Sequence, residues 1–354
     1  MELINLTIPE AAYTTERWSW EYKNNPYGFL AAVAEQNGRI VGHMGLFLMN
    51  LKVGDNIIRG SQACDLGVHP DFRGQGIFLA IGKALMKRAG ENGILLTYGF
   101  PNRPAYFGHL KYGWFDAARI PVLINCFNTY NVVVEKLYSR HKKLMILDPF
   151  VKKSSRFIDY HFRSERASER KPRSELNFGI HEISSVDERM DEFWNRVSKD
   201  YGMIVVRDQR YLKWRFFDRP DFRYKVLVAE KNDDIEGYMV LSAEKSTYGK
   251  VGHIDDALAS SEDAARNLIQ SAFDFFTKKE VDLVECWMLE ESIWYDLLRE
   301  KGFVPMHLLV PSSKKRFIVH INSVQFLNQY QNTRKGWYVT YGDSDYAGGR
   351  PSIT

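Results

Sequence analysis

A glycine-rich turn within residues 65–78 has the residue types and spacing most directly suited to chemistry. An apolar alternation typical of a strand runs up to Pro70, which ends it. Gly74 and Gly76 follow, directly before a helix expected over Ile77–Glu91. Backbone N–H groups at such a turn converge on an anion at the helix N-terminus, and no side-chain ligand is required. The stretch therefore predicts a binding site for a pyrophosphate.

A second motif occupies residues Pro101–Trp114 and follows the apolar run Ile94–Phe100, which is typical of a strand. Between the two motifs, the expected helix Ile77–Glu91 has apolar residues spaced about 3.6 residues apart, which indicates one buried face. These apolar residues are Leu79, Ile81, Leu85, Met86 and Ala89. The chain thus reads strand, glycine turn, helix, strand and helix.

The glycine turn resembles motif A of the GNAT superfamily of acyl-CoA N-acyltransferases, whose pattern is Arg/Gln-x-x-Gly-x-Gly/Ala after a strand ending in Val-x-Pro. Arg73 and Gly76 match that pattern. Phe78 stands where the family usually has Gly or Ala, although an Eis-like branch, which this chain resembles, accepts a larger apolar residue. The resemblance implies acetyl-CoA as the acyl donor.

The second motif resembles the family's motif B, Asn-x-x-Ala-x-x-x-Tyr-x-x-x-Gly-Phe. Asn102 and Ala105 match, His109 takes the Tyr position, and Gly-Trp replaces Gly-Phe. By this resemblance, the turn would bind the pyrophosphate, the strand before it would pair with the pantetheine, and Val68 would supply the oxyanion contact. The implied donor-binding residues are Leu66, Gly67, Val68, Arg73, Gly74, Gln75, Gly76, Ile77, Phe78 and Asn102.

Protonation of the departing thiolate is assigned to motif B, where Tyr106 and His109 lie three residues apart on one helix face. A phenol with a pKa of about 10 suits protonation of a thiolate with a pKa of about 8.5, whereas an imidazole with a pKa of about 6.5 has to be held protonated. His109 is the first candidate because it occupies the family's Tyr position. A packing role is its alternative, and Tyr106 is then the substitute.

Removal of a proton from the acceptor is the other requirement, because an alkylamine with a pKa of about 10 arrives protonated. Asp65 is the best-placed carboxylate, since an acid is uncommon in a strand otherwise flanked by apolar residues. Strand alternation allows Asp65 to point to solvent instead. Asp343 and Asp345, near the C-terminus, are more distant candidates.

An aromatic cluster near the N-terminus marks the side on which the acceptor is expected to enter. Its members are either core residues or a stacking surface for a sugar or a nucleobase. The acceptor-binding candidates are Trp18, Trp20, Tyr22 and Tyr27.

The composition narrows the class of protein. The 354 residues carry a formal net charge of +4, which is small for this length and points to neither nucleic acid nor a membrane as a partner. Basic residues between Lys152 and Arg173 form a local cluster, interpreted as a solvated linker or an anion-binding patch. Three scattered cysteines lack metal-ligand spacing, so no metal is predicted. The absence of an apolar leader or a long apolar run favours the cytoplasm.

The chain contains an internal repeat. Trp20–Pro26 is echoed by Trp214–Pro220, each with a tryptophan, an aromatic residue two positions later and a proline six positions later. Ala34–Gly42 is echoed by Ala229–Gly237, and both read as strand, polar turn and strand. The second copy departs at residues 255–263, where acids replace the glycines and would repel a pyrophosphate. This copy is expected to wall off the acceptor site, to hold a dimer, or to give structural support alone.

These observations predict an α/β (α+β) protein of two tandem GNAT-like domains, each with a mixed, mostly antiparallel central sheet flanked by helices. The expected division is an acetyl-CoA-binding domain at residues 1–150, a linker at 151–177, a degenerate GNAT-like domain at 178–324 and an exposed C-terminal tail at 325–354.

The predicted activity is acetyl transfer from acetyl-CoA by direct attack of a primary amine, on a small amine or an amino sugar, in a ternary complex. The alternatives are a non-catalytic acyl-CoA sensor or interaction module, and a transferase of a longer acyl or an aminoacyl group. A homodimer is compatible with this organisation.

Overall fold

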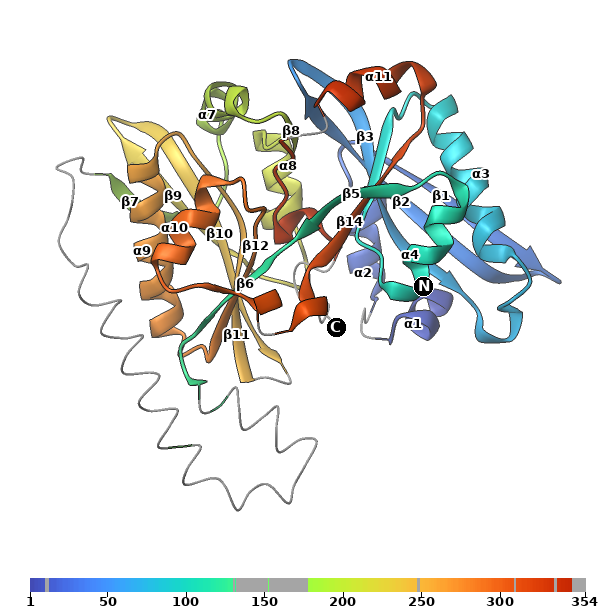
Figure 1. Cartoon of the computed structure of the whole chain (residues 1–354), viewed down its shortest axis with the longest axis horizontal. Helices are drawn as coiled ribbons and strands as arrows, with labels where there is room; N and C mark the ends of the chain where they lie inside the picture. The colour runs from blue at the N-terminus through green and yellow to red at the C-terminus, as the bar shows by residue number, and fades with distance from the viewer. Residues whose placement is uncertain are drawn as a thin grey trace. The chain divides into compact units, whose positions relative to one another are not determined.

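The chain folds into two compact units in the computed structural model, which describes residues 1–9, 13–129, 131, 152, 178–246, 249–308, 310–333 and 336–345 (Figure 1). Neither unit is continuous in sequence. The first comprises Met1–Ile120, Ser185–Arg223 and Lys315–Ile353, and the second comprises Pro121–Ser184 and Tyr224–Lys314.

The first unit is built on a sheet whose described strands pair antiparallel, apart from the parallel neighbours β3 and β4. Its order is β1-β2-β3-β4-β14-β5, and β8 pairs with β2. The strands are β1 (Phe29–Gln36), β2 (Arg39–Val53), β3 (Asn56–Val68), β4 (Leu96–Gly99), β5 (Phe115–Ile120), β8 (Met203–Val205) and β14 (Lys315–Ile321).

The second unit is built on a sheet of the same kind, in which β11 and β12 are the parallel pair. Its order is β13-β6-β12-β11-β10-β9-β7. The strands are β6 (Val122–Cys126), β7 (Gly179–Ile183), β9 (Lys225–Lys231), β10 (Asp234–Ser246), β11 (Gly249–Ala259), β12 (Leu283–Trp287) and β13 (Val304–Pro305). Two mixed, mostly antiparallel sheets flanked by helices confirm the predicted fold class.

Helices flank both sheets. The first unit has α1 (Glu2–Thr7), α2 (Thr15–Trp18), α3 (Ile77–Glu91), α4 (Arg103–His109), α7 (Arg189–Val197), α8 (Gln209–Leu212) and α11 (Val324–Thr333). The second unit has α9 (Glu262–Lys278) and α10 (Ile293–Glu300). α2 and α8 each continue into a wide helical turn, η2 (Ser19–Lys23) and η7 (Lys213–Phe217) respectively. None of these helices is long and apolar enough to span a membrane.

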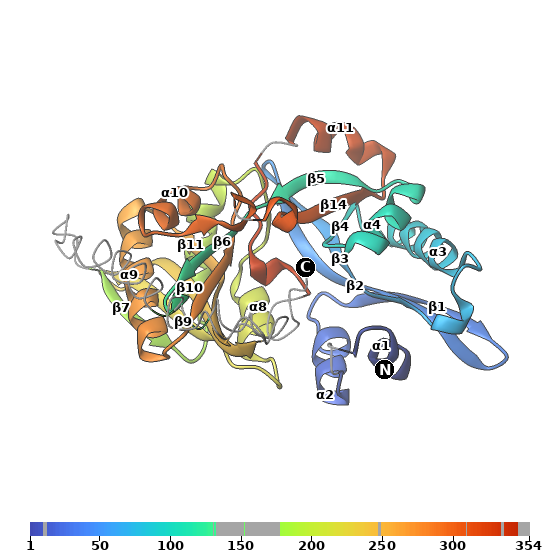
Figure 2. The ribbon, with the colours of Figure 1, turned by 60° about the horizontal axis from the view of Figure 1, so that its bottom comes forward.

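Helices cover both faces of the first sheet. Figure 2 shows α3 and α4 on one face and α1 and α2 on the other. The predicted helix over residues 77–91 is confirmed with the same bounds, and its apolar face packs in a core with β2. The core side chains of α3 are Ile81, Leu85, Met86 and Ala89, and those of β2 are Met44, Leu46 and Leu48.

The two sheets exchange a strand. β6 follows β5 after Pro121 but pairs with β12 and β13 in the second sheet. β14, from near the C-terminus, lies instead between β4 and β5 in the first sheet. The compact units therefore cut across the contiguous division predicted at residues 150 and 178. The assignment of a donor-binding domain and a degenerate domain stays a prediction.

The C-terminal segment departs from the predicted exposed tail. Trp337–Ser344 is buried, from Trp337 at 8% exposed to Ser344 at 0%. The predicted linker at 151–177, with most of its basic cluster, lies outside the described residues apart from Lys152. The tail beyond Asp345 lies outside them as well.

Candidate active site

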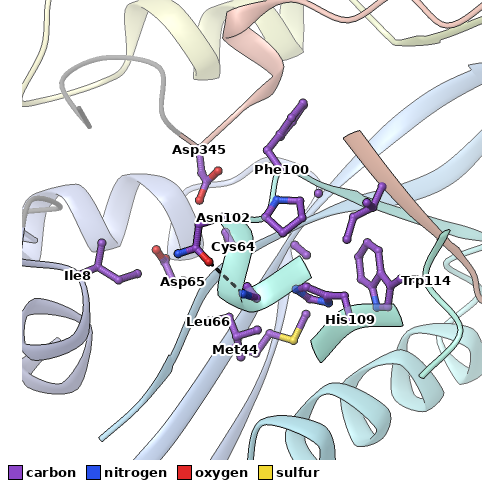
Figure 3. A pocket seen from close by; sticks show the side chains of 15 residues that line it. Ile8, Met44, Cys64, Asp65, Leu66, Phe100, Asn102, His109, Trp114 and Asp345 are labelled. Carbon is purple, nitrogen blue, oxygen red and sulfur yellow. Dashed lines mark hydrogen bonds between the residues drawn. The ribbon is translucent and has the colours of Figure 1, made fainter. Parts of the chain in front are cut away.

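A cavity opens where β3 and β4 separate. The two strands pair only from Gly60 with Leu96 to Gln62 with Tyr98. β3 then continues to Val68, while the chain leaves β4 and enters α4. The cavity has a volume of about 90 Å³ (Figure 3). Its lining includes Met44, Cys64, Asp65, Leu66, Phe100, Asn102, His109, Trp114 and Asp345.

Asp65 enters this cavity because β3 has a bulge there. The pairing of β2 with β3 shifts register between His43 and Gly45, and Asp65 has a φ of +52°. The bulge interrupts the alternation of the strand, so Asp65 is only 3% exposed and lines the cavity. The alternative of a solvent-facing Asp65 is therefore wrong.

Two phenols hold the Asp65 carboxylate. The hydroxyl groups of Tyr13 and Tyr22 each donate to Asp65 Oδ2 at 2.6 Å. Burial, and then the nearby Asp65, raises the pKa of Tyr22 well above its usual value, so Tyr22 keeps its proton. No sequence motif marks Tyr13 as a site residue, because its contact with Asp65 joins residues 52 positions apart in the chain.

Cys64 lines the cavity as a thiol. Its Sγ lies 3.5 Å from the Tyr22 hydroxyl. Burial, and then the Asp65 charge, raises the pKa of this thiol well above its usual value. Because the thiolate is the nucleophilic form of cysteine, Cys64 is unsuited to carry an acyl group.

His109 lines the cavity from α4, but in its neutral form. Its Nδ1 lies 2.6 Å from the hydroxyl of Tyr112. Burial, and then His320, lowers the pKa of His109 to about 3. The condition for His109 to act as a proton donor, that it be held protonated, is therefore not met near neutral pH. The neutral ring remains able to form hydrogen bonds in the cavity.

Tyr106 points away from the cavity. Its hydroxyl donates to Asp116 Oδ2 on β5 at 2.7 Å, and this hydrogen bond raises the pKa of Tyr106. The guanidinium of Arg316 lies 4.0 Å from the centre of the Tyr106 ring. Of the two proton-donor candidates, His109 is among the described residues that line the cavity and Tyr106 is not.

The glycine turn has the backbone that an anion site needs. Gly74 and Gly76 both have a φ of +79°, and a Cβ added to either would have no neighbouring atom within 4 Å. Gly76 is the N-cap of α3, and the apolar residues 77–79 form the first turn. The N–H groups of a first helical turn have no partner inside the helix, so they are available to an anion. Arg73 begins this turn, and its Nε donates to the carbonyl of Val68 at 3.2 Å.

The corresponding turn of the second unit is closed by its own side chains. Ser261 caps α9, and its hydroxyl accepts a hydrogen bond from the N–H of Ala264 at 3.3 Å. Glu262 and Asp263 then place two carboxylates in the first turn. These contacts support, in physical terms, the prediction that the second copy does not bind a pyrophosphate.

Two of the predicted donor-binding residues also have structural roles. Asn102 caps α4, where its Oδ1 accepts from the N–H of Ala105 at 3.0 Å, and it also lines the cavity. Phe78 packs its ring against α4, with its centre 5.4 Å from that of His109. A Cβ built on Gly108 would lie 2.4 Å from Phe78 Cε1, so the large residue at 78 is matched by the absence of a side chain at 108.

Two of the four aromatic residues lie in the core, and the other two are half-buried outside the cavity lining. Trp20 and Tyr22 are 2% and 1% exposed. Tyr27 donates to Asp208 at 3.0 Å, and Trp18 stacks on Tyr22 with ring centres 5.4 Å apart. Among the described residues that line the cavity, none belongs to these four. The alternative of a core role is therefore favoured over stacking on an acceptor.

Asp345 reaches the cavity from the C-terminal segment (Figure 3). The preceding residues are anchored within the first unit. Asp343 forms a buried ion pair with Arg207 at 2.8 Å, and Arg215 Nε donates to the carbonyl of Gly342 at 2.9 Å. Of the two distant carboxylate candidates, Asp345 thus lies in the cavity and Asp343 is part of its support.

Comparison with known proteins agrees with this architecture. Residues 8–115 match the profile of the acetyltransferase (GNAT) domain. No curated protein matches the sequence.

Three solved structures share the fold over most of the chain. A GCN5-related N-acetyltransferase from Anabaena variabilis has a TM-score of 0.62 and 13% identity, covering 91% of this chain and 69% of that one. N-myristoyltransferase of Saccharomyces cerevisiae with bound myristoyl-CoA has a TM-score of 0.54 and 13% identity, covering 88% and 74%. Eis1 from Mycobacterium abscessus has a TM-score of 0.51 and 15% identity, covering 84% and 66%.

Proposed function

From the match of residues 8–115 to the GNAT acetyltransferase domain profile, we propose that the chain transfers an acetyl group from acetyl-CoA to a primary amine. The observation that carries the proposal is a cavity lined by the buried carboxylate of Asp65. The cavity lies where β3 and β4 separate, and the chain continues from β3 into the glycine turn and from β4 into α4. In this proposal, the thioester of an acyl-CoA bound at the turn would lie beside these strands.

Donor binding is assigned to the glycine turn. The pyrophosphate would accept hydrogen bonds from the N–H groups of residues 74–79, with the positive end of the α3 dipole behind them. β3 continues beyond Gln62, where its pairing with β4 ends, and this stretch would pair with the pantetheine as with an added strand. The predicted oxyanion donor, Val68, lies at the end of this edge.

The cavity supports a small acyl group. An engineered cavity of about 150 Å³ holds one benzene molecule. The cavity beside Asp65, at about 90 Å³, suits a group of a few atoms such as acetyl. The myristoyl-CoA in the yeast structure shows that this fold serves longer chains elsewhere, so chain length has to be tested directly.

The two carboxylates support an amine acceptor. Asp65 and Asp345 face one cavity, and a negative potential there attracts an ammonium group. Asp65 would take one proton from the ammonium, after which the amine nitrogen attacks the thioester carbon and the C–S bond breaks. The nitrogen then loses a second proton, and protonation of the departing thiolate gives CoA thiol. Attack is direct, because Cys64 is a buried thiol and does not provide an acyl-enzyme step.

The donor site is tested by calorimetric titration of acetyl-CoA into the wild type and Gly76→Glu. The control is Gly38→Glu, which adds the same charge at another glycine with positive φ (+76°) and open space, in the turn between β1 and β2. We expect the wild type and Gly38→Glu to bind, and Gly76→Glu to lose binding while remaining folded. Equal binding by all three proteins would rule out the turn as the pyrophosphate site.

The reaction is tested by release of CoA thiol in the presence of an amine panel that includes small alkylamines and amino sugars. Acetyl-, hexanoyl- and myristoyl-CoA are compared as donors. Turnover that is fastest with acetyl-CoA supports the proposal, and a preference for the longer donors supports a transferase of longer acyl groups. Binding without turnover by any amine supports the acyl-CoA sensor instead.

A further inference from the structure

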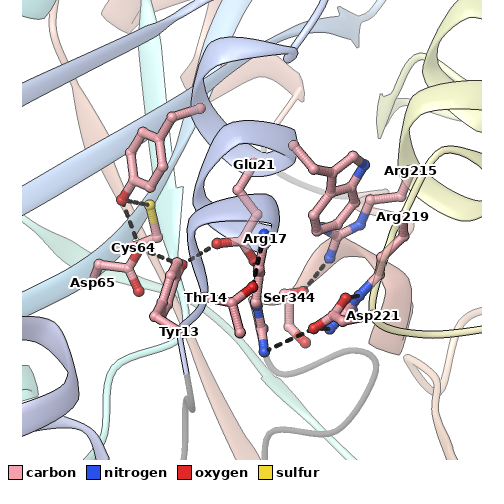
Figure 4. Close-up of polar contacts among 12 residues, drawn as sticks. Tyr13, Thr14, Arg17, Glu21, Cys64, Asp65, Arg215, Arg219, Asp221 and Ser344 are labelled. Carbon is pink, nitrogen blue, oxygen red and sulfur yellow. Dashed lines mark hydrogen bonds and ion pairs between the residues drawn. The ribbon is translucent and has the colours of Figure 1, made fainter. Parts of the chain in front are cut away.

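A buried chain of acidic and phenolic groups begins at Asp65, which lines the cavity (Figure 4). The Tyr13 hydroxyl lies 2.6 Å from Asp65 Oδ2, and it also contacts Oε2 of Glu21, on η2. Asp65, Tyr13 and Glu21 are 3%, 5% and 2% exposed. One phenol therefore bridges two buried carboxyl groups, one of which faces the cavity.

The number of protons distinguishes this bridge from an ordinary pair of hydrogen bonds. A phenol has one proton, whereas the Tyr13 oxygen has two carboxyl oxygens within hydrogen-bond distance. Both contacts are satisfied only when one of the two carboxyl groups supplies a second proton. When both carboxyl groups are ionised, one of the contacts lacks a proton and is repulsive. The bridge is therefore completed by the arrival of one proton.

A cation compensates the far end of the chain. Arg17 Nε lies 3.4 Å from Glu21 Oε1, and Arg17 Nη1 lies 3.5 Å from Asp221, whose side chain is about one-third exposed. Arginine stays protonated at all ordinary pH values, so Arg17 balances charge and does not itself pass the proton on. It allows Glu21 to carry a negative charge in a buried position.

We infer that Tyr13 and Glu21 extend Asp65 into a proton relay that stores the proton removed from the acceptor amine; this rests on the proposed function. The ammonium gives its proton to Asp65. Asp65 passes a proton to the Tyr13 oxygen while the Tyr13 proton moves to Glu21. Asp65 is then ionised again, Tyr13 is a neutral phenol, and Glu21 is a neutral acid. No oxidation or reduction is involved. After product release the proton returns through Tyr13 to Asp65 and leaves to solvent through the cavity that Asp65 lines.

Other titratable groups also face Asp65, and one of them supplies a matched control. Across the cavity and on neighbouring elements these groups include Tyr22, Cys64 and Asp345. Tyr22 donates to the same Oδ2 at the same 2.6 Å as Tyr13, and its hydroxyl further contacts Cys64, not Glu21. Tyr22→Phe therefore removes one hydrogen bond to Asp65 and leaves the contacts of Tyr13 with Asp65 and Glu21 in place.

The test measures thiol release across pH for Tyr13→Phe, Glu21→Gln and Tyr22→Phe. Two double variants, in which Glu21→Gln is combined with Tyr13→Phe or with Tyr22→Phe, are measured in the same way. A general acid–base group is worth about 10²–10⁴-fold in rate, so we expect Tyr13→Phe and Glu21→Gln each to lower kcat/KM by at least about tenfold. Combining these two should cost no more than either alone. Combining Tyr22→Phe with Glu21→Gln should multiply their effects.

The pH profile separates a relay from a packing role. Glu21→Gln removes one of the two carboxyl groups of the bridge, so a relay should alter the acid limb of the pH profile of kcat/KM. A packing role would lower the melting temperature and the rate but leave that limb in place. Unchanged limbs with multiplicative effects of Tyr13→Phe and Glu21→Gln would overturn the relay while the transferase stands. A wild type that binds acetyl-CoA but acetylates no amine would overturn the transferase and the relay together.

Discussion

Trp20 and Trp214 donate their indole N–H groups to each other's main-chain carbonyl oxygens, at 2.7 and 3.0 Å, with ring centres 5.7 Å apart. The two residues hold equivalent places in the sequence repeat, in the turns η2 and η7. Both tryptophans are buried. The repeat is therefore visible in the first unit as a reciprocal contact between its two copies.

Loss of this reciprocal pair should destabilise the first unit. Trp214→Phe leaves the buried carbonyl of Trp20 without its indole donor, which costs about 1–3 kcal/mol for an unsatisfied buried group, in addition to lost packing. Denaturant unfolding measures the change. The control is Trp18→Phe, a half-buried ring that stacks on Tyr22. An equal cost in the two variants would show that ring packing, and not the paired hydrogen bonds, accounts for the loss.

The ion pair between Arg207 and Asp343 should be essential for the C-terminal segment. Both side chains are at most 2% exposed, and removal of one partner from such a pair costs about 3–5 kcal/mol. Arg207→Met is therefore expected to destabilise the protein and to lower activity, because Asp345 lies two residues beyond Asp343. The control is Arg119→Met.

Arg119 forms an ion pair with Asp116 at 3.0 Å with both side chains about 40% exposed. Such an exposed pair contributes about 0–1 kcal/mol. Unfolding curves and thiol-release rates of Arg207→Met and Arg119→Met are compared under the same conditions. Similar small effects of both substitutions would contradict an anchoring role for Arg207.

The free energy of unfolding should depend on pH in the way expected for a buried, neutral histidine at position 109. Its pKa is about 3 in the folded protein and about 6.5 in an unfolded chain. Because the unfolded chain binds the proton more tightly, the folded state loses stability as pH falls from about 6.5 towards 3, by up to about 1.4 kcal/mol per pH unit.

His109→Gln removes this titration, so the stability advantage of the wild type over the variant should shrink as pH falls through that window. Unfolding free energies at several pH values measure the difference, and titrations shared by both proteins largely cancel. A difference that stays constant with pH would mean that His109 is not held neutral by burial.

The fit between Phe78 and Gly108 should appear as a coupling between the two positions. Gly108→Ala would put its Cβ against the Phe78 ring, and such overpacking typically costs about 1–3 kcal/mol. Phe78→Ala removes the ring and makes room for that Cβ. We expect Gly108→Ala to be less destabilising in the Phe78→Ala background. Additive free energies of unfolding would argue that the two side chains adjust independently.

The local features of this protein could be predicted from its sequence. The α3 helix over residues 77–91 follows from apolar spacing, and the turn with positive φ before it follows from Gly74 and Gly76. The repeat between Trp20–Pro26 and Trp214–Pro220 predicted two related domains, and the described residues contain two sheets of the same kind. These features depend on neighbours within a few residues or on recurrence along the chain, so the sequence contains them directly.

The composition of the cavity was decided by the tertiary structure. Alternation along β3 left the direction of Asp65 open, and only the bulge against β2 turned it inward. Tyr13, Glu21 and Asp345 lie 52, 44 and 280 residues from Asp65 in the chain, and no local pattern links them to it. The exchange of β6 and β14 likewise depends on which strand edges meet. Pairing between distant segments is set by competition among all possible partners in the folded chain, which a local sequence pattern does not record.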